Sequence, residues 1–457
     1  MKTSPQIERI NQKLVLAKKA DPKCKIFGAN HHKYHINPPV SESQVLDFEA
    51  KYKVRLPECY RAFVLGVGDK KAKQKEQMVG AFYGLYAFGE SVGELVDDAE
   101  KRLKEPCLLS PKMSDGEWEQ LTAPIQALFA KYSELGDDDS DDLDEQIEQK
   151  YGELFAGLLP LGTQGCSYSH ALVLTGEFAG RVVNVDNELQ KPIFCFENNF
   201  LDWYERYLDE VISGELLGGG WFGYYRGEST QELLQLYENS NDSDEKQDCI
   251  NALLHKNPPL SAEILAKIEQ LIQKNDENQS DLVEILAQSS YKRAKPHLLA
   301  LLNSDEKRVY QCLHRYFDEK KPEWIDIVKE RLANIADEET FRFATYVLTA
   351  KKGDFGVFVV PFTQHSDPKM QITAFYTLGQ SQNKQNYLNA FIDGLHSDNA
   401  DVVRTALQGL SDITDRRLLP YFKAVAERFP TNDDYVLTAL NHCLKPFGLD
   451  NQSVLDT

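Results

Sequence analysis

Apolar and polar positions repeat in a fixed order in the C-terminal half of the chain. An Asp or Asn is followed by apolar or small residues, mostly four, seven and eleven positions later, and the pattern starts at Asp305, Asp337, Asp367, Asn399 and Asp433. Successive starts are 32, 30, 32 and 34 residues apart, a period typical of stacked helix pairs. The recurrent apolar positions are Val309, Cys312, Tyr316, Phe341, Ala344, Leu348, Ala374, Leu378, Val403, Ala406, Leu410, Leu437, Leu440 and Leu444. We therefore predict an all-α solenoid over residues 229–457, with these positions in its core.

The beginning of the chain has helical periods. Ser41 and Gln44 form a capping box in front of an apolar helix face, and Pro57 is the first residue of a second predicted helix. The aromatic, glycine-rich stretch 80–88 indicates a strand or the edge of a hairpin. A third helix is predicted to begin at Ser91 and to carry Leu95, Val96, Ala99 and Leu103.

Strand periods follow from Leu158 onward. Short apolar runs alternate with turn residues, which is typical of an antiparallel meander. The runs are 158–161, 171–175, 181–185 and 193–196. An amphipathic helix over about 200–212 closes this part, and Gly214 supplies its C-terminal stop. We predict an α+β domain over residues 1–217, built from an antiparallel sheet with helices.

Glycines and aromatic residues mark the junction at 218–228. Three glycines at 218–220 precede four aromatic residues, namely Trp221, Phe222, Tyr224 and Tyr225. One end of a helix stack must be covered, so we favour packing of one domain onto the next over ligand binding for this cluster.

The charge of the chain restricts its partners. With 51 Lys and Arg against 71 Asp and Glu, the net charge is −20, which disfavours nucleic acid and anionic membranes. Residues 1–100 carry 16 bases and 13 acids, whereas residues 101–220 carry 9 bases and 23 acids. A basic protein is therefore the expected partner, and the negative field is concentrated in the second of these segments.

Cysteine usage and hydropathy indicate a compartment. The eight cysteines are scattered without a close pair, as expected of reduced thiols. Residues 1–20 lack an apolar signal-peptide core, and the chain has no apolar run of 18 residues. We expect a soluble cytoplasmic protein.

The densest charge cluster lies in a segment over about 104–154 and includes Asp137, Asp138, Asp139, Asp141, Asp142 and Asp144. Such a block is often a solvated, disordered loop. Alternatively, it mimics a phosphate backbone and steers a basic nuclease into a complex, because complementary charge raises association rates.

Other candidate chemistry is poorly supported. His31 and His35 have a zinc-like spacing on a helix, but Pro38 and Pro39 just downstream favour a loop. Cys166 and His170 are four residues apart on a predicted strand, about 13 Å along the backbone, too far for a thiol and its base. The chain has no phosphate-binding loop with lysine. We expect no catalytic residues, no metal and no cofactor.

Four segments resemble the SUKH superfamily over roughly 38–215. They are the helix carrying Leu56-Pro57-Glu58-Cys59-Tyr60-Arg61-Ala62-Phe63 with Gly66 after it, Leu159-Pro160-Leu161-Gly162, the strand 182–186, and Phe200-Leu201-Asp202-Trp203-Tyr204. The segment 104–154 looks like an insertion relative to the compact family core. The C-terminal repeats resemble HEAT-type repeats, whose role is protein binding.

The resemblance implies a protein that binds partners without catalysis. Bacterial SUKH members commonly look like immunity proteins that neutralise polymorphic toxins, often nucleases, and fungal relatives look like regulators of cell-wall assembly. We favour stoichiometric masking of a basic toxin domain. The alternatives are a scaffold or regulator with several partners and, as the least supported reading, an enzyme acting through an N-terminal cleft.

Overall fold

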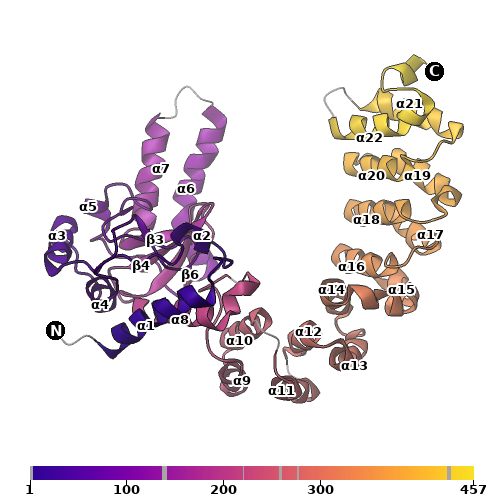
Figure 1. The fold of residues 1–457 in the computed structure, drawn as a ribbon. Helices are drawn as coiled ribbons and strands as arrows, with labels where there is room; N and C mark the ends of the chain where they lie inside the picture. The colour runs from indigo at the N-terminus through magenta and orange to yellow at the C-terminus, as the bar shows by residue number, and fades with distance from the viewer. Residues whose placement is uncertain are drawn as a thin grey trace. The chain divides into compact units, whose positions relative to one another are not determined.

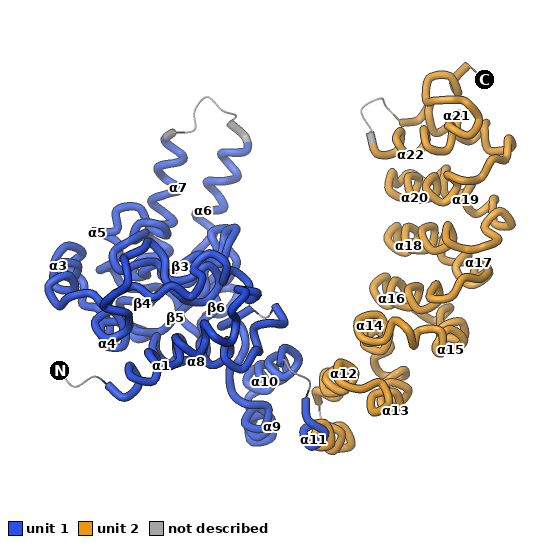
Figure 2. The backbone as a smooth tube through the Cα atoms, in the orientation of Figure 1, with its two compact units in different colours: residues 1–264 blue, residues 265–457 orange. Residues whose placement is uncertain are grey.

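The structure is a computed structural model that describes residues 4–135, 141–219, 221–256, 260–274, 277–429 and 434–456. It divides into two compact units, residues 1–264 and residues 265–457 (Figure 2). The first unit is α+β and the second is helical (Figure 1), which confirms the predicted fold class. The junction expected at 218–228 lies inside the first unit, which also includes α9 (Thr230–Asn239) and α10 (Ser243–His255).

Short helices precede the sheet of the first unit. They are α1 (Pro5–Ala20), α2 (Ala29–His32), α3 (Glu42–Tyr52), α4 (Glu58–Gly66) and α5 (Ala99–Arg102). The predicted capping box of α3 is present, since Ser41 N–H donates to Gln44 Oε1 at 2.8 Å and Gln44 N–H donates to Ser41 Oγ at 3.3 Å. Pro57 was predicted to be the first residue of α4 and is its N-cap instead, so the helix begins one position later, at Glu58.

The helix predicted from Ser91 is wrong. Residues 91–98 form turns and bends, and only α5 is helical. Ser91 and Asp98 have φ angles of 52° and 50°, in the left-handed region, which breaks a right-handed helix on both sides of the segment. Leu95 and Val96 are still buried, so the apolar residues that suggested a helix pack into the core from a loop.

The sheet is the predicted antiparallel meander. Its strands are β3 (Leu158–Gly165), β4 (Tyr168–Val173), β5 (Val182–Asp186) and β6 (Ile193–Phe194), in that spatial order. Leu159 pairs with Leu172, and Ala171 pairs with Val183. A separate hairpin pairs β1 (Gln77–Met78) with β2 (Leu85–Tyr86). Strand β2 lies within the aromatic stretch 80–88 that was predicted to form a strand or hairpin edge, and β1 lies just before it.

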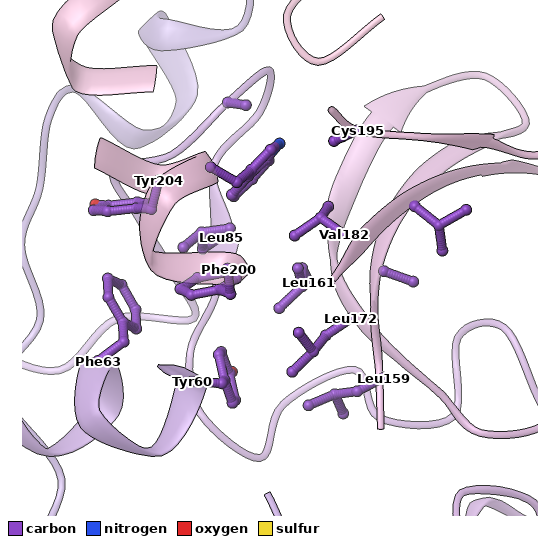
Figure 3. Packing of buried hydrophobic residues seen from close by; sticks show 14 of the residues in the cluster. Tyr60, Phe63, Leu85, Leu159, Leu161, Leu172, Val182, Cys195, Phe200 and Tyr204 are labelled. Carbon is purple, nitrogen blue, oxygen red and sulfur yellow. The ribbon is translucent and has the colours of Figure 1, made fainter. Parts of the chain in front are cut away.

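Helix α8 (Phe200–Ser213) and η2 (Glu215–Gly218) follow the sheet. Figure 3 shows Leu161, Leu172 and Val182 of the sheet facing Phe200 of α8 and Tyr60 of α4. The ring centroids of Phe63 and Tyr204 are 4.7 Å apart, and those of Tyr60 and Phe200 are 5.0 Å apart, both edge to face. Edge-to-face packing adds to the free energy gained from burial, so these rings fix α4 against α8.

Two helices that lie side by side, α6 (Asp115–Leu135) and α7 (Asp141–Leu154), extend beyond the sheet (Figure 1). The segment that was expected to be an insertion is thus largely helical. Among its described acidic residues, Asp142, Asp144, Glu145 and Glu148 lie on α7.

The second unit is a succession of helices. Its elements are α11 (Ala262–Gln273), which crosses the unit boundary, α12 (Gln279–Ser289), α13 (Tyr291–Leu301), α14 (Glu306–Tyr316), η3 (Asp318–Trp324), α15 (Ile325–Arg331), η4 (Leu332–Asn334), α16 (Glu338–Leu348), α17 (Gly356–Val359), η5 (Val360–Gln364), α18 (Pro368–Gly379), η6 (Lys384–Tyr387), α19 (Leu388–Leu395), α20 (Ala400–Leu410), η7 (Arg416–Leu418), α21 (Leu419–Arg428), α22 (Asp434–Leu444), η8 (Lys445–Phe447) and η9 (Ser453–Asp456). Helices α14, α16, α18, α20 and α22 stack in one layer (Figure 1), an arrangement consistent with a solenoid.

The repeated Asp and Asn residues are helix caps. The side chains of Asp305, Asp337, Asp367 and Asn399 accept backbone N–H groups at the starts of α14, α16, α18 and α20. Asp433 lies outside the described residues. Satisfying free N–H groups at a helix start favours helix formation there. The apolar positions four and seven residues after each of Asp305, Asp337 and Asn399 are fully buried, as the repeat predicts.

Candidate protein-binding surfaces

The two helices α6 and α7, which we call the acidic hairpin (residues 115–135 and 141–154), have their own small apolar seam. Leu128 of α6 packs with Leu143 and Ile147 of α7, and Tyr151 covers the end of this cluster. On α7, residues 143, 147 and 151 are four apart and therefore share one face. The other faces of α7 are free to carry carboxylates.

The carboxylates of α7 point to solvent. Asp142, Asp144, Glu145 and Glu148 are exposed, and Asp142 only accepts a hydrogen bond from Gln146 at 3.1 Å. Among the described residues, none of these four carboxylates forms an ion pair; the acidic hairpin pairs charges instead at Lys150–Glu153 and Asp115–Lys191. No basic side chain in the described part of the chain therefore pairs with these carboxylates.

The expected binding aspartates divide into three groups. Asp142 and Asp144 lie on the exposed face of α7. Asp141 is the first residue of α7. Asp137, Asp138 and Asp139 lie outside the described residues.

The acidic surface continues at the base of the hairpin. Glu148 hydrogen-bonds to Asp97, and this contact between two carboxyl groups raises the pKa of Glu148. Both residues line a pocket of about 220 Å³ together with Glu94 and Tyr151. Two aromatic side chains of α6, Phe129 and Tyr132, are 43% and 41% exposed on the same hairpin. Exposed aromatic rings beside charge are frequent at protein interfaces.

The junction aromatics pack within the first unit. Phe222 is buried against Trp203 and Tyr207 of α8, with ring centroids 5.5 and 5.4 Å away. Tyr224 O–H donates to Gln164 Oε1 at 2.9 Å, and Tyr225 stacks on His255 of α10 at 3.6 Å. These contacts connect the end of the sheet, α8 and α10.

Trp221 behaves differently from the other three junction aromatics. Its side chain is 49% exposed, although its ring lies 6.0 Å from Phe82 and 6.2 Å from Tyr168. This residue therefore contributes to the surface of the first unit.

The histidine and cysteine candidates are not brought together. Helix α2 ends at His32, so His31 and His35 do not share a helical face, and His35 Nε2 instead lies 3.0 Å from the carbonyl oxygen of Lys73. Within the described ranges, no cluster of three or more His, Cys, Asp or Glu side chains could hold a metal ion. Cys166 is exposed in the β3–β4 turn, whereas His170 is fully buried, and burial lowers its pKa to about 3.

A second surface occurs on the helical unit. The ninth residue after each repeat start in the sequence is His314, Tyr346, Tyr376, Gln408 and His442 in turn. At the end of this series, a groove of about 640 Å³ is lined by Arg404, Gln408, Ser411, Tyr435, Thr438, Ala439 and His442. Tyr376 and Tyr435 are 59% and 76% exposed. The repeat spacing contained this signal, since equivalent positions of stacked helices lie on one face.

Comparison with protein families adds to this geometry. Residues 39–206 match the SMI1 / KNR4 family (SUKH-1). The matched region includes α3, α4, both sheets, the acidic hairpin and the start of α8. No curated protein and no solved structure matches the chain. Helix α1, the junction aromatics and the helical unit lie outside the SUKH-1 match. No helix among the described residues is both long enough and apolar enough to cross a membrane.

Proposed function

We propose that this chain is a non-enzymatic immunity protein, which neutralises a basic toxin domain by binding it and covering its active surface. The SUKH-1 domain supports a protein-binding role of the immunity or regulatory kind. The observation that carries the proposal is the exposed row of carboxylates without basic partners on α7, in the same hairpin as the partly exposed rings of Phe129 and Tyr132. Together they provide charge for steering and apolar area for tight binding.

The two contributions act at different stages of association. Residues 104–154 contain 14 acids and 4 bases, so a basic protein is attracted before contact, and this attraction chiefly raises the association rate. After docking, the aromatic rings of α6 supply buried area, which chiefly slows dissociation. A nuclease is a suitable target, because its phosphate-binding site is basic and a carboxylate row can occupy it.

The helical unit braces or extends this contact in our proposal. Its repeated caps and buried positions support a HEAT-like array. The groove at α20 and α22 favours a second candidate function, that of a scaffold or regulator with several protein partners. We place either function in the cytoplasm, where the eight cysteines, none of them in a disulfide in the described chain, remain reduced.

The test is co-expression of the chain with toxins encoded beside it, followed by capture of the tagged chain from native cells at low and high salt. One abundant basic partner, released by salt, together with protection of the host, is the expected result. Protection should be lost when the six aspartates at 137–139, 141, 142 and 144 are replaced by asparagine. Many weak partners without protection would favour the scaffold, and protection that survives these substitutions would contradict the role of the acidic hairpin.

A further inference from the structure

The first unit also carries a basic, aromatic face that is distinct from the acidic hairpin. Two segments provide its charge. The segment 23–33 contributes Lys23, Lys25 and Lys33, and the lysine loop, residues 69–76, contributes Lys70, Lys71, Lys73 and Lys75. All seven lysines are exposed, and none forms an ion pair within the ranges that the structure describes. Other bases near the chain start do pair, such as Arg9 and Lys13 with Glu205.

The lysine loop is held in place by a buried amide. Asn37 is 4% exposed; its Nδ2 donates to the carbonyl oxygen of Lys75 at 2.9 Å, and its Oδ1 accepts the N–H of Lys75 at 2.9 Å. Asp69 N–H donates to the carbonyl oxygen of Asn37 at 3.0 Å. Because both ends of the loop are tied to one buried residue, its lysines are presented in a defined arrangement, which lowers the entropy cost of binding.

A groove separates the lysine loop from α2. It measures about 640 Å³ and is lined by residues that include His31, Gln74, Lys75, Glu76 and Glu90. His31 also belongs to a group of rings, which we call the aromatic patch: Phe27, His31 and Trp221 are exposed, and Tyr83 and Tyr168 are partly exposed. The groove and the aromatic patch therefore share a residue and form a continuous surface.

The rings of the aromatic patch contact one another. Tyr83 lies 4.6 Å from His31 and 5.5 Å from Phe27 between ring centroids. Buried Phe82 connects the two ends, since its ring lies 6.4 Å from Phe27 and 6.0 Å from Trp221. Phe27 and Trp221 are 54% and 49% exposed. Exposed rings supported by partly buried ones are typical of binding hot spots, because they bury a large area on binding and lose little rotamer freedom.

We propose that this face docks an acidic peptide segment of a partner protein, with an aromatic or large apolar side chain of the segment seated against Phe27 and Trp221. Charge complementarity argues for this occupant, since the seven unpaired lysines attract carboxylates. Phe27, His31 and Trp221 lie outside residues 39–206, whereas the lysine loop lies inside them, so this face combines parts of the chain within and beyond the SUKH-1 match. The partner is oppositely charged to the one proposed for the acidic hairpin, and the two proposals are independent.

The short range of the electrostatic field in physiological salt favours binding of a short acidic segment over binding of nucleic acid. A Debye length is about 8 Å at physiological ionic strength, so a short peptide in the groove feels mainly the nearby lysines. An extended polyanion would also meet the rest of the surface of a chain with net charge −20.

The test measures fluorescence anisotropy of a short fluorescein-labelled peptide in which glutamates flank one tryptophan, titrated with the full chain. Comparison probes are the same peptide with lysines in place of glutamates and a single-stranded oligonucleotide of matching length. The variants are K71Q/K73Q/K75Q and F27S/W221S. The control is K351Q/K352Q/K369Q, which removes three exposed lysines of the second unit that have no ion pair in the described chain. Circular dichroism checks that every variant is folded.

We expect the acidic peptide to bind, and each test variant to weaken binding by about tenfold or more, with no effect of the control. No saturation at concentrations on the order of a millimolar would overturn the proposal. The proposal would also be overturned if K71Q/K73Q/K75Q bound the acidic peptide as tightly as the parent chain does. Tighter binding of the oligonucleotide would assign the face to nucleic acid instead. Sedimentation of the chain alone completes the test, because a dimer that K71Q/K73Q/K75Q dissociates would assign the face to a second copy.

Discussion

The carboxyl group of Glu148 on α7 hydrogen-bonds to that of Asp97, in the turn before α5. Two carboxyl groups can share such a bond only when one of them holds a proton, and the pKa of Glu148 is raised for this reason. Asp144 and Glu145 nearby act in the same direction. The base of the acidic hairpin is therefore a site where proton binding and the binding of a cation compete.

This competition predicts proton release on binding of a basic partner. A cationic partner favours the ionised form of Glu148, so affinity should rise as pH increases through the raised pKa and should fall below it. Isothermal titration calorimetry in buffers of different ionisation enthalpy would measure the released protons. In D97N the shared proton is lost, and the pH dependence should move to lower pH. An unchanged profile in D97N would show that the pair is not part of the contact.

The acidic hairpin should determine the association rate. Replacing Asp142, Asp144 and Glu145 by their amides removes three unpaired carboxylates without changing side-chain size. At low salt we expect association with a basic partner to slow by about tenfold, with a smaller change in dissociation. Stopped-flow measurements over a salt series would show this. The matched control is E319Q/E330Q/E427Q on the second unit, which should leave the rate unchanged, and an equal effect of both triples would indicate only a non-specific field.

His170 should make the first unit sensitive to acid. Its ring is fully buried beside Phe82 and Trp203, and burial lowers its pKa from 6.5 to about 3. The unfolded chain takes up a proton at this residue below about pH 6.5, whereas the folded chain does not, so stability is present at neutral pH and declines as pH falls toward 3. At pH 4.5 the loss from this group should be about 2–3 kcal/mol.

The variant His170→Leu tests this assignment. Leucine has a similar volume and no titrating group, so the acid loss of stability should be smaller in H170L than in the parent chain. Urea unfolding of the first unit, followed by tryptophan fluorescence at several pH values, is the measurement. His31→Leu serves as a control, because His31 is exposed. Parallel pH profiles for H170L and the parent would place the acid sensitivity elsewhere.

Much of the fold follows from local sequence signals. The capping box at Ser41, the meander from Leu158 and the repeated caps were all predictable, because each depends on a few residues adjacent in the chain. The helix predicted from Ser91 failed, since the apolar pattern does not show that Ser91 and Asp98 adopt left-handed backbone angles. The sequence did not show whether the acidic segment is a loop or a helix. Leu143 and Ile147 pack against Leu128 of another helix, and this tertiary contact stabilises α7.

The candidate surfaces were less predictable than the fold. The acidic run is visible in the sequence, but its contact with Asp97 joins segments about fifty residues apart, and no local signal reports it. The basic face was missed although residues 1–100 have a small positive charge, because the segment 23–33 and the lysine loop lie about forty residues apart in the chain and approach each other only through tertiary packing around the groove at His31 and Lys75. Trp221 looked like a junction residue, and its exposure depends on tertiary packing.

Glu284 should stabilise the packing of α12 against α14 in the second unit. Its side chain on α12 is 3% exposed and accepts hydrogen bonds from Arg315 at 2.8 Å and Tyr316 at 3.0 Å, both on α14; it also pairs with Arg308. Glu284→Ala leaves Arg308 half-buried without its main partner. We expect a loss of about 2–3 kcal/mol in unfolding free energy, somewhat below the cost of breaking a fully buried pair because Arg315 is partly exposed.

The exposed Glu323 provides the control for Glu284. Glu323 also accepts from a tyrosine and a lysine, Tyr291 and Lys295, both at 2.8 Å, but its side chain is 42% exposed. Surface pairs of this kind contribute less than about 1 kcal/mol, so E323A should be nearly neutral. Urea unfolding followed by far-ultraviolet circular dichroism would compare the two variants. Equal losses would show that burial of Glu284 is not what makes its contacts matter.

The repeated caps predict the effect of substitutions at Asp337, because Asn399 shows that asparagine caps an equivalent helix of the same chain. Asp337 Oδ1 accepts the N–H of Thr340 at 2.9 Å at the start of α16, and Asn399 performs the same role at the start of α20. Asp337→Ala should therefore destabilise α16 by about 1 kcal/mol, whereas Asp337→Asn should be nearly silent, because asparagine caps helices about as well as aspartate does. Hydrogen exchange read by mass spectrometry on peptides covering α16 isolates this helix from the rest of the chain. Faster exchange confined to D337A, with D337N like the parent, is the expected result. If D337N exchanged as fast as D337A, the charge of Asp337 rather than its cap would stabilise the helix, and the repeat would have to be explained by electrostatics instead of hydrogen bonding.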